Sequence, residues 1–272
     1  MLLQAADVAI YDFDDALYAD QGEGPPWRRL APKASKVFAA AKTADRVVAG
    51  NEILADWASA VSRDVVVVPS CVAVEDYRAK ADYRLSDPPR LVWIGSAGNE
   101  TLLSMIAEEL LELNRRCGAR LTLIGTSHQS LAALEQMIDR VAWSEQVQHQ
   151  VLATADVGLM PLRDDPYSRG KCGYKLLQYA ASGLPAVASP VGTNASILAS
   201  LGLPAARTPE DWLDAVSAIL ELSESERAKL GKGARERVTE KYSYRAWLQR
   251  WQQAVQLSEG TPYAPLADGA RQ

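Results

Sequence analysis

Short apolar runs alternate with helical patterns along most of the chain. Runs rich in apolar and β-branched residues predict buried strands, at 8–13, 46–49, 65–70, 91–94, 121–124, 141–143, 157–160 and 186–189. Apolar residues spaced by three and four predict helices, over 30–42, 52–60, 101–116, 130–140 and 173–181. Strands that alternate with helices favour parallel βα units, so the sequence predicts an α/β fold.

A polar, proline-bearing segment at 78–90 is expected to be a linker that divides this pattern into two unequal parts. The part before it, 1–77, holds about three expected strands and is interpreted as a partial N-terminal Rossmann-like domain. The part after it, 91–235, holds about five and predicts a complete C-terminal Rossmann-type, doubly wound parallel sheet. An aromatic-rich helix is expected within 240–257, returning towards the first part, and 258–272 is expected to be a flexible tail.

Composition and charge narrow the class of protein. A length of 272 residues with 48% hydrophobic residues allows two domains, or one and a half. The formal charge of -5 argues against nucleic acid as the main partner, because phosphate-dominated binding needs a cationic surface. The chain begins without a basic signal-peptide region, and no apolar run approaches the ~20 residues of a transmembrane helix. Three widely separated cysteines form no disulfide framework, so the sequence predicts a cytoplasmic protein.

Candidate chemistry is densest at 156–194, where a buried strand runs through a polar loop into a helix that Gly173 opens. Free N–H groups and the positive dipole end at a helix N-terminus suit phosphate. If the helix is regular through Lys171, Lys175 and Gln178, one face offers two ammonium groups and an amide to a ligand above the sheet. A solvated helix face fits the same spacing, so both interpretations stay open.

A second glycine turn, GSAG at 95–98, follows a predicted strand and opens a helix. It lacks the third glycine of the dinucleotide fingerprint, so a nicotinamide site is poorly supported. Two glycine-rich strand-to-helix turns in one sheet suit a diphosphate held between two backbone nests.

These segments together resemble a known family. The order WIGS, DVGLMPL and GKCGYKLLQYAASGLPAVASPVGTN looks like the C-terminal nucleotide-sugar domain of glycosyltransferase family 4, the group 1 retaining enzymes of the GT-B fold. The segment ADRVVAGNEILADWA, followed by VVVVPSCVAVEDY, is similar to the end of their N-terminal domain, and VAIYDFDDALY to its acidic strand end. The resemblance covers 7–255 and leaves the first part of a normal N-terminal domain without a counterpart.

The resemblance implies a glycosyltransferase that moves a sugar from a nucleoside-diphosphate sugar to an acceptor with retention. The implied partners are the nucleotide sugar and a small-molecule, glycan or lipid-linked acceptor, with no metal or other cofactor. The incomplete first half leaves an alternative: a non-catalytic or truncated nucleotide-sugar-binding protein that needs a partner or a missing segment. A sugar-nucleotide epimerase is a further alternative, although its acid and histidine equipment is not evident. The exposed edge of a partial sheet favours self-association.

Departures from the family pattern shift the expected site residues. The two glutamates that most members carry ahead of A-x-G-x-P are replaced by Gly170 and Gln178. By resemblance, Gln178 binds a ribose hydroxyl, and Lys171 or Asp165 takes over the contact near the donor sugar. The family's Arg and Lys after the first glycine turn are also absent, so Lys171 and Lys175 become the expected partners of the diphosphate charge.

The resulting candidate site has three groups of residues. The residues assigned catalytic roles are Lys171, Lys175 and Asp165. The residues assigned to donor binding are Gly95, Ser96, Trp143, Arg169, Cys172, Gly173, Tyr174 and Gln178. The residues assigned to the acceptor side are Asp12 and Asp14. Trp143 stands where the base is expected, although filling the core is the commoner role of such an indole.

Three acids, Asp12, Asp14 and Asp15, stand at the end of the first expected strand. Strand alternation places Asp12 and Asp14 on one face of the sheet and Asp15 on the other. The resemblance favours an acceptor-facing role for Asp12, a surface turn is the alternative, and metal binding is disfavoured. A basic stripe at 28–36 fits a solvated helix face better than weak contact with an anionic membrane or a phosphorylated acceptor.

Overall fold

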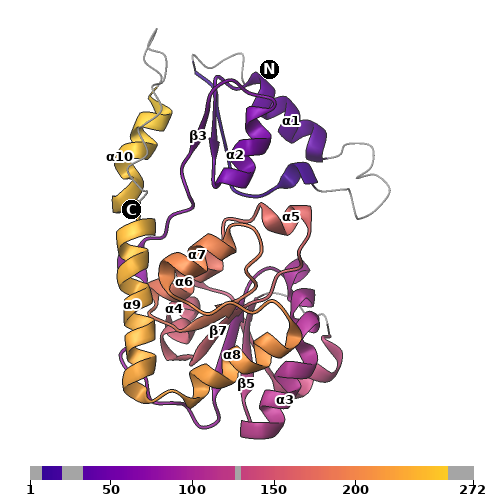
Figure 1. Ribbon diagram of the computed structural model, residues 1–272, viewed down its shortest axis with the longest axis vertical. Coiled ribbons are helices and arrows are strands. Elements are labelled where there is room, and N and C mark those ends of the chain that lie inside the picture. Colours follow the sequence, from indigo (N-terminus) through magenta and orange to yellow (C-terminus); the bar gives the residue numbers. More distant parts are fainter. Residues whose placement is uncertain (1–7, 20–32, 126–129, 257–272) are drawn as a thin grey trace.

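The described part of the chain folds into two lobes, each built around a parallel sheet (Figure 1). The computed structural model describes residues 8–19, 33–125 and 130–256. Within these ranges, a three-stranded sheet forms the N-terminal lobe and a five-stranded sheet forms the C-terminal lobe. The predicted α/β class is therefore confirmed. No described helix combines the length and the apolar character that crossing a bilayer requires.

The N-terminal lobe has the strand order β1-β2-β3, and all of its described strands run parallel. Its elements are β1 (Ile10–Phe13), η2 (Leu17–Ala19), α1 (Lys33–Thr43), β2 (Arg46–Ala49), α2 (Glu52–Ser59) and β3 (Val65–Val67). The central strand β2 is buried along its whole length because helices cover it on one side and the helix at 244–255 covers it on the other. Asn51 starts α2 by accepting the N–H of Leu54 at 2.9 Å.

The C-terminal lobe has the strand order β6-β5-β4-β7-β8, again parallel throughout. Its strands are β4 (Arg90–Ile94), β5 (Arg120–Gly125), β6 (Ile138–Ala142), β7 (Val157–Met160) and β8 (Ala186–Ala188). The strand order reverses direction between β4 and β7, which are neighbours although two other strands separate them in the sequence. A crevice at the carboxyl ends of these two strands is where ligands bind in open α/β sheets.

Helices cover both faces of the five-stranded sheet. The helical elements of this lobe are η5 (Ala97–Ile106), α3 (Ala107–Cys117), η6 (Ala132–Met137), α4 (Glu145–Thr154), α5 (Pro166–Arg169), α6 (Tyr174–Ala181), α7 (Asn194–Leu201), α8 (Pro209–Glu221) and α9 (Glu224–Tyr242). One core packs beneath α3 and α8, and a second packs beneath α6, α7 and α9. The rigid double-sided packing fixes the carboxyl ends of β4 and β7.

The last described helix, α10 (Tyr244–Val255), lies beside the N-terminal lobe, whereas α9 lies along the C-terminal lobe (Figure 1). A single extended residue, Ser243, separates the two helices, and its side chain caps α10. The buried guanidinium of Arg46 donates to the carbonyl oxygen of Ala254 at 2.9 Å and bonds the carboxylate of Asp64. Strand β2 therefore holds the end of α10 on the first lobe.

Some expected elements differ from the structure. The helix expected over 130–140 is wrong, because only 132–137 is helical, as a 3-10 turn, and the chain from Ile138 pairs with β5. The pairing with a neighbouring strand overrides the local helical pattern. The helix expected over 101–116 begins earlier, as a 3-10 segment from Ala97, and becomes α-helical only at Ala107. The expected tail, 258–272, lies outside the described residues.

Candidate active site

Two adjoining cavities lie in the cleft between the lobes. The first, about 510 Å³, opens at the carboxyl ends of the C-terminal sheet, and we call it the C-lobe cavity. The second, about 760 Å³, opens at the carboxyl ends of the N-terminal sheet and against α10, and we call it the N-lobe cavity. Asp14 and Tyr174 line both cavities. The two spaces therefore meet at these two residues.

The turn after β4 forms one wall of the C-lobe cavity. Gly95 and Ser96, both assigned to donor binding from the sequence, line the cavity there together with Asn99, whose amide donates to the Ser96 hydroxyl at 3.0 Å. A side chain at position 95 would place its Cβ 2.4 Å from the Trp93 ring and 3.1 Å from Cε of Lys175. Glycine is required there because a side chain would overlap the Trp93 ring, which lies directly against the turn.

The opposite wall is the start of α6. Gly173 has a φ of +66°, in the left-handed region, and precedes the first helical residue, Tyr174. The helix is therefore not regular from Lys171, and the expectation of one continuous helical face through Lys171, Lys175 and Gln178 is wrong. All three nevertheless line the C-lobe cavity, because the turn at Gly173 returns Lys171 to the same space.

The two lysines differ in their surroundings. Burial, with a smaller contribution from neighbouring Lys171, lowers the pKa of Lys175 to about 8, against a weaker opposing effect of Asp15. The Lys175 ammonium lies 5.5 Å from the Trp93 ring centre. Lys171 has its ammonium 3.6 Å from a carboxylate oxygen of Asp15 and 4.5 Å from the Tyr167 ring centre. The Lys171 ammonium thus pairs with a carboxylate of the N-terminal lobe, and the Lys175 ammonium faces the cavity.

A chain of hydrogen bonds supports the far end of the C-lobe cavity. The Trp143 indole donates to Gln148 at 2.9 Å, and the amides of Gln148 and Gln178 both donate to the Tyr77 hydroxyl, at 3.0 and 3.1 Å. Trp143 is 55% exposed and lines the cavity, so the core-filling role is wrong. An exposed indole fixed through its N–H offers a flat surface to a planar ligand group.

The remaining sequence-predicted donor residues separate into two kinds. Cys172 lines the C-lobe cavity but is buried, accepts the Asn51 amide at 3.2 Å, and has its pKa raised to about 11 by burial. Asp165 and Arg169 do not line it. Asp165 caps α5 by accepting the Ser168 N–H, and Arg169 is largely exposed and pairs with the exposed Asp164. Of the two residues expected near the donor sugar, only Lys171 reaches the cavity.

Gly170, which replaces a family glutamate, lies at the contact between the lobes. Its carbonyl oxygen accepts the Asn51 amide at 3.0 Å, and a Cβ added there would lie 2.4 Å from Cβ of Ala16 and 3.1 Å from the Leu54 side chain. A glutamate cannot occupy this position without separating the lobes. The substitution therefore coincides with close packing rather than with an open cavity.

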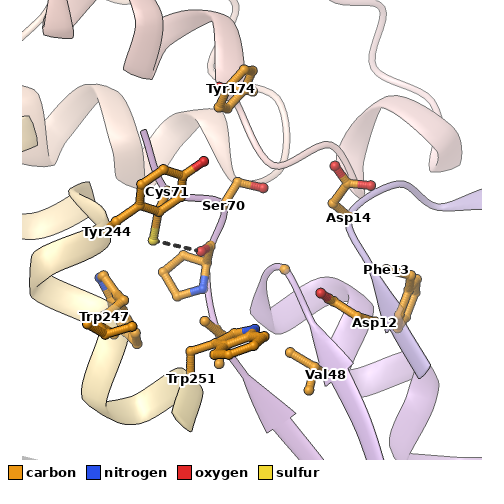
Figure 2. A pocket seen from close by; sticks show the side chains of 14 residues that line it. Asp12, Phe13, Asp14, Val48, Ser70, Cys71, Tyr174, Tyr244, Trp247 and Trp251 are labelled. Carbon is orange, nitrogen blue, oxygen red and sulfur yellow. Dashed lines mark hydrogen bonds between the residues drawn. The ribbon is translucent and has the colours of Figure 1, made fainter. Parts of the chain in front are cut away.

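The N-lobe cavity has walls of two kinds (Figure 2). Asp12 and Asp14 come from β1 and the turn after it, as predicted, and burial together with the neighbouring Asp14 raises the pKa of Asp12. The facing wall is formed by α10, whose contributions are Tyr244, Trp247, Leu248 and Trp251. The cavity thus sets carboxylates opposite aromatic rings.

Sequence reasoning missed part of the site. Asp15 was placed away from Asp14 by strand alternation, yet it lines the C-lobe cavity, because β1 ends at Phe13 and the rule does not extend beyond it. The aromatic residues of α10 were noticed without a role. The spacing of Tyr244, Leu248 and Trp251 at i, i+4 and i+7 was the available signal for a single exposed stripe.

Other features of the sequence have plain positions in the structure. Lys33 and Lys36 are exposed on α1, and the rest of the basic stripe lies outside the described residues. Among the residues that the structure describes, no group of three or more His, Cys, Asp or Glu side chains could hold a metal ion. Catalysis without a metal stays a prediction.

Comparison with known proteins identifies the C-terminal part. Residues 88–222 match the model of the family described as glycosyl transferases group 1. A comparison with curated proteins finds no match. The matched segment contains all five strands of the C-terminal sheet and all residues of the glycine turn, the lysine loop and α6.

Solved structures with a similar fold match both lobes of the chain. The chain is similar to sucrose-phosphate synthase from Thermosynechococcus elongatus, with a TM-score of 0.70 at 18% identity over 90% of this chain and 66% of that one. It is similar to a mutant of TarM from S. aureus in complex with fondaparinux, alpha-GlcNAc-glycerol and UDP, with a TM-score of 0.67 at 14% identity over 90% and 50%. It is also similar to WaaG, a glycosyltransferase involved in lipopolysaccharide biosynthesis. The TM-score is 0.67 at 14% identity over 91% of this chain and 75% of that one.

These likenesses confirm the fold class, two Rossmann-type lobes in the GT-B-like arrangement. The chain spans about half to two thirds of the length of the synthase and TarM. Within this chain the N-terminal lobe has the smaller sheet, with three described strands against five in the C-terminal lobe. Residues 88–222 are therefore a domain of the group 1 glycosyl transferase family, set in a chain with a GT-B-like fold.

Proposed function

We propose that this protein transfers a sugar from a nucleoside-diphosphate sugar to an acceptor hydroxyl with retention of the anomeric configuration. The observation that carries the proposal is the half-buried Lys175 ammonium in the C-lobe cavity, with its pKa lowered to about 8 by burial and by Lys171. Among the described residues, no carboxylate forms an ion pair with it. A cation in this position is stabilised by a bound anion, and a diphosphate suits a crevice between glycine-rich turns.

The donor would lie across the crevice between β4 and β7. The diphosphate would contact the turn at Gly95 and Ser96 on one side and the start of α6 with Lys175 on the other. The base would lie on the exposed Trp143 indole, and Gln178 would hydrogen-bond a ribose hydroxyl. The family match of residues 88–222 and the UDP bound to TarM support this class of donor.

The reaction breaks the bond between the anomeric carbon and the β-phosphate oxygen, and the electron pair stays on the diphosphate. The acceptor oxygen forms the new bond on the same face, since the configuration is retained. Its hydroxyl proton goes to the departing phosphate oxygen, which lies on that face. Negative charge grows on the diphosphate, so Lys171, Lys175 and the free N–H groups at the start of α6 stabilise the transition state more than the ground state.

The acceptor would enter from the N-lobe cavity. This cavity meets the C-lobe cavity at Asp14 and Tyr174, so a hydroxyl placed between them reaches a sugar held by the donor. Asp12 and Asp14 are the hydrogen-bond acceptors available to that hydroxyl and its neighbours. Their carboxylates would then have the acceptor-side role that the sequence led us to expect.

The test separates binding from turnover. UDP, GDP and ADP are titrated into the protein and into the Lys175→Met variant by calorimetry, with Lys229→Ala, an exposed lysine of α9, as the matched control. At least one nucleotide should bind the protein and the control, and Lys175→Met should bind it about tenfold or more weakly. Release of nucleoside diphosphate from the matching sugar nucleotide then measures turnover.

The outcomes divide the alternatives. Binding with turnover supports the transferase. Binding without turnover, with or without added acceptors, supports the alternative of a nucleotide-sugar-binding protein that needs a partner or a further segment. No binding of any nucleotide at millimolar concentration, or equal binding by Lys175→Met, would overturn the proposed donor site.

A further inference from the structure

The N-lobe cavity differs in charge from the donor site that it adjoins. Of the described residues that line it, none is a lysine, arginine or histidine, and two are the carboxylates of Asp12 and Asp14. The C-lobe cavity is also lined by two carboxylates, those of Asp14 and Asp15, but there Lys171 and Lys175 offset them. A ligand of the N-lobe cavity therefore meets negative charge without a compensating cation on the cavity wall.

The facing wall offers ring and aliphatic surface. Tyr244, Leu248 and Trp251 are 56%, 53% and 44% exposed, and they follow one another at i, i+4 and i+7 along α10. Exposed aromatic side chains in one stripe mark a surface that contacts a ligand. Figure 2 shows the ring of Trp251 on the α10 side and Asp12 on the opposite side of the same space.

This wall is held in place from below. The Trp247 indole packs on the core of Val48, Val66 and Val68, and its N–H donates to the Lys241 carbonyl oxygen at 2.6 Å. Arg46 fixes the far end of α10 through the Ala254 carbonyl oxygen. The stripe therefore presents its rings from a supported helix, which reduces the conformational entropy that binding would cost.

The carboxylates set the charge that a ligand can have. Asp12 is already partly desolvated beside Asp14, and an anionic group brought between them would add a third negative charge at low solvation. Like-charge contacts of this kind weaken binding at an interface. Neutral hydroxyl groups, in contrast, donate hydrogen bonds to carboxylates and are favoured there.

We infer that the acceptor is an uncharged, hydroxyl-bearing compound with an apolar ring face, such as a neutral glycoside, and that acceptors with a phosphate or carboxylate are rejected. The hydroxyl groups face Asp12 and Asp14, and the ring face lies on the α10 stripe. This inference rests on the proposed function for the meaning of "acceptor", but the binding preference belongs to the N-lobe cavity alone.

The experiment compares two probes that differ in one charge. The 4-nitrophenyl β-D-glucoside and the 4-nitrophenyl β-D-glucuronide share a sugar ring and an aromatic group, and only the second carries a carboxylate. Each is titrated into the protein by calorimetry. The glucoside should bind about tenfold or more tightly than the glucuronide, equal to about 1.4 kcal/mol. Equal or tighter binding of the glucuronide, or no binding of the glucoside at millimolar concentration, overturns the inference.

Variants assign the preference to the two walls. The double substitution Asp12→Asn with Asp14→Asn should bring the two affinities within about threefold of each other, because it removes the repulsion. Trp251→Ala should weaken glucoside binding by about tenfold and Trp251→Phe should restore most of it, because a ring face replaces the lost stacking. A preference that survives the double substitution contradicts the inference.

The nucleotide titrations test the proposed function separately from the glycoside titrations. If the glucoside preference holds and no nucleotide binds, the N-lobe cavity is a neutral-ligand site and the donor proposal fails. If UDP binds, Lys175→Met weakens that binding and the glucuronide is preferred to the glucoside, the donor proposal stands and the acceptor class is wrong.

Discussion

The two cavities of the cleft share Asp14 and Tyr174 and yet differ in charge, because lysines accompany the carboxylates only in the C-lobe cavity. Parallel strand ends and glycine turns build the C-lobe cavity, which carries two ammonium groups. Strand ends of the same kind build the N-lobe cavity, but acids follow its first strand and a distant helix supplies aromatic rings. The comparison shows that strand ends of the same kind can open cavities of different charge, because the side chains placed there determine that charge.

Lys175→Met gives the strongest test of the cationic half. The long apolar stem is kept and the charge is lost, so turnover should fall by about 10²–10³-fold through lost stabilisation of the diphosphate. Stability should not fall, because a lysine whose folded-state pKa is lowered below its unfolded value costs stability below that lowered pKa, about 8. Product formation and the midpoint of chemical denaturation measure the two effects. A variant that keeps full turnover would show that the cation is not used.

Gly170→Ala tests whether the stability of the protein depends on close contact between the two lobes. The added Cβ would lie 2.4 Å from Cβ of Ala16, so we expect unfolding to become easier by about 1–3 kcal/mol. Gly98→Ala is the matched control, since no heavy atom lies within 4 Å of a Cβ added there. Denaturant midpoints compare the two variants. Equal stabilities would mean that the lobes tolerate separation at this point.

The pH dependence of UDP binding should show whether the charge on Lys175 is used. Lys175 is protonated below its pKa of about 8, so the dissociation constant for UDP should be constant below pH 8 and rise by up to about tenfold per pH unit above it. In Lys175→Met the dissociation constant for UDP should be higher and should not change with pH over the same range. Titrations between pH 7 and about 9.5 check this. The same upward slope in the variant would assign the effect to another group.

Asp15→Asn should have the smallest effect. The pair between Asp15 and Lys171 spans 3.6 Å and is partly exposed to solvent, so its loss changes free energies by less than about 1 kcal/mol. We expect UDP affinity to improve by no more than about threefold, because Lys171 is no longer shared with a carboxylate. Asp56→Asn, on the exposed side of α2, is the control. A loss of affinity in Asp15→Asn would instead mean that the carboxylate positions Lys171 for the diphosphate.

The fully buried strands were predictable from the sequence because residues buried on both faces carry a continuous apolar signal. Strands β2 and β7 match the expected residues at both ends. The helix expected over 130–140 was wrong because its pattern competes with pairing to β5, a contact that is distant in the sequence. Local pattern and tertiary contact conflict there, and the tertiary contact determines the structure.

The C-lobe cavity was largely predictable, because its residues follow strands and glycines in sequence order. Lys171, Lys175 and Gln178 line it, although the turn at Gly173 breaks the continuous helix that was expected to align them. The N-lobe cavity was only half predictable. Asp12 follows from the end of β1, whereas the opposing stripe on α10 lies far away in the sequence and reaches β1 only through the chain crossing at Ser243.

This crossing has a consequence for the order in which the protein is made. Every described residue that lines the C-lobe cavity precedes position 179, whereas the wall of the N-lobe cavity is complete only with Trp251. Synthesis from the N-terminus therefore delivers the whole lining of one cavity to the nascent chain while the other still lacks its aromatic side. A ribosome that has just added Tyr242 holds a chain with every described lining residue of the C-lobe cavity but without the α10 wall of the N-lobe cavity.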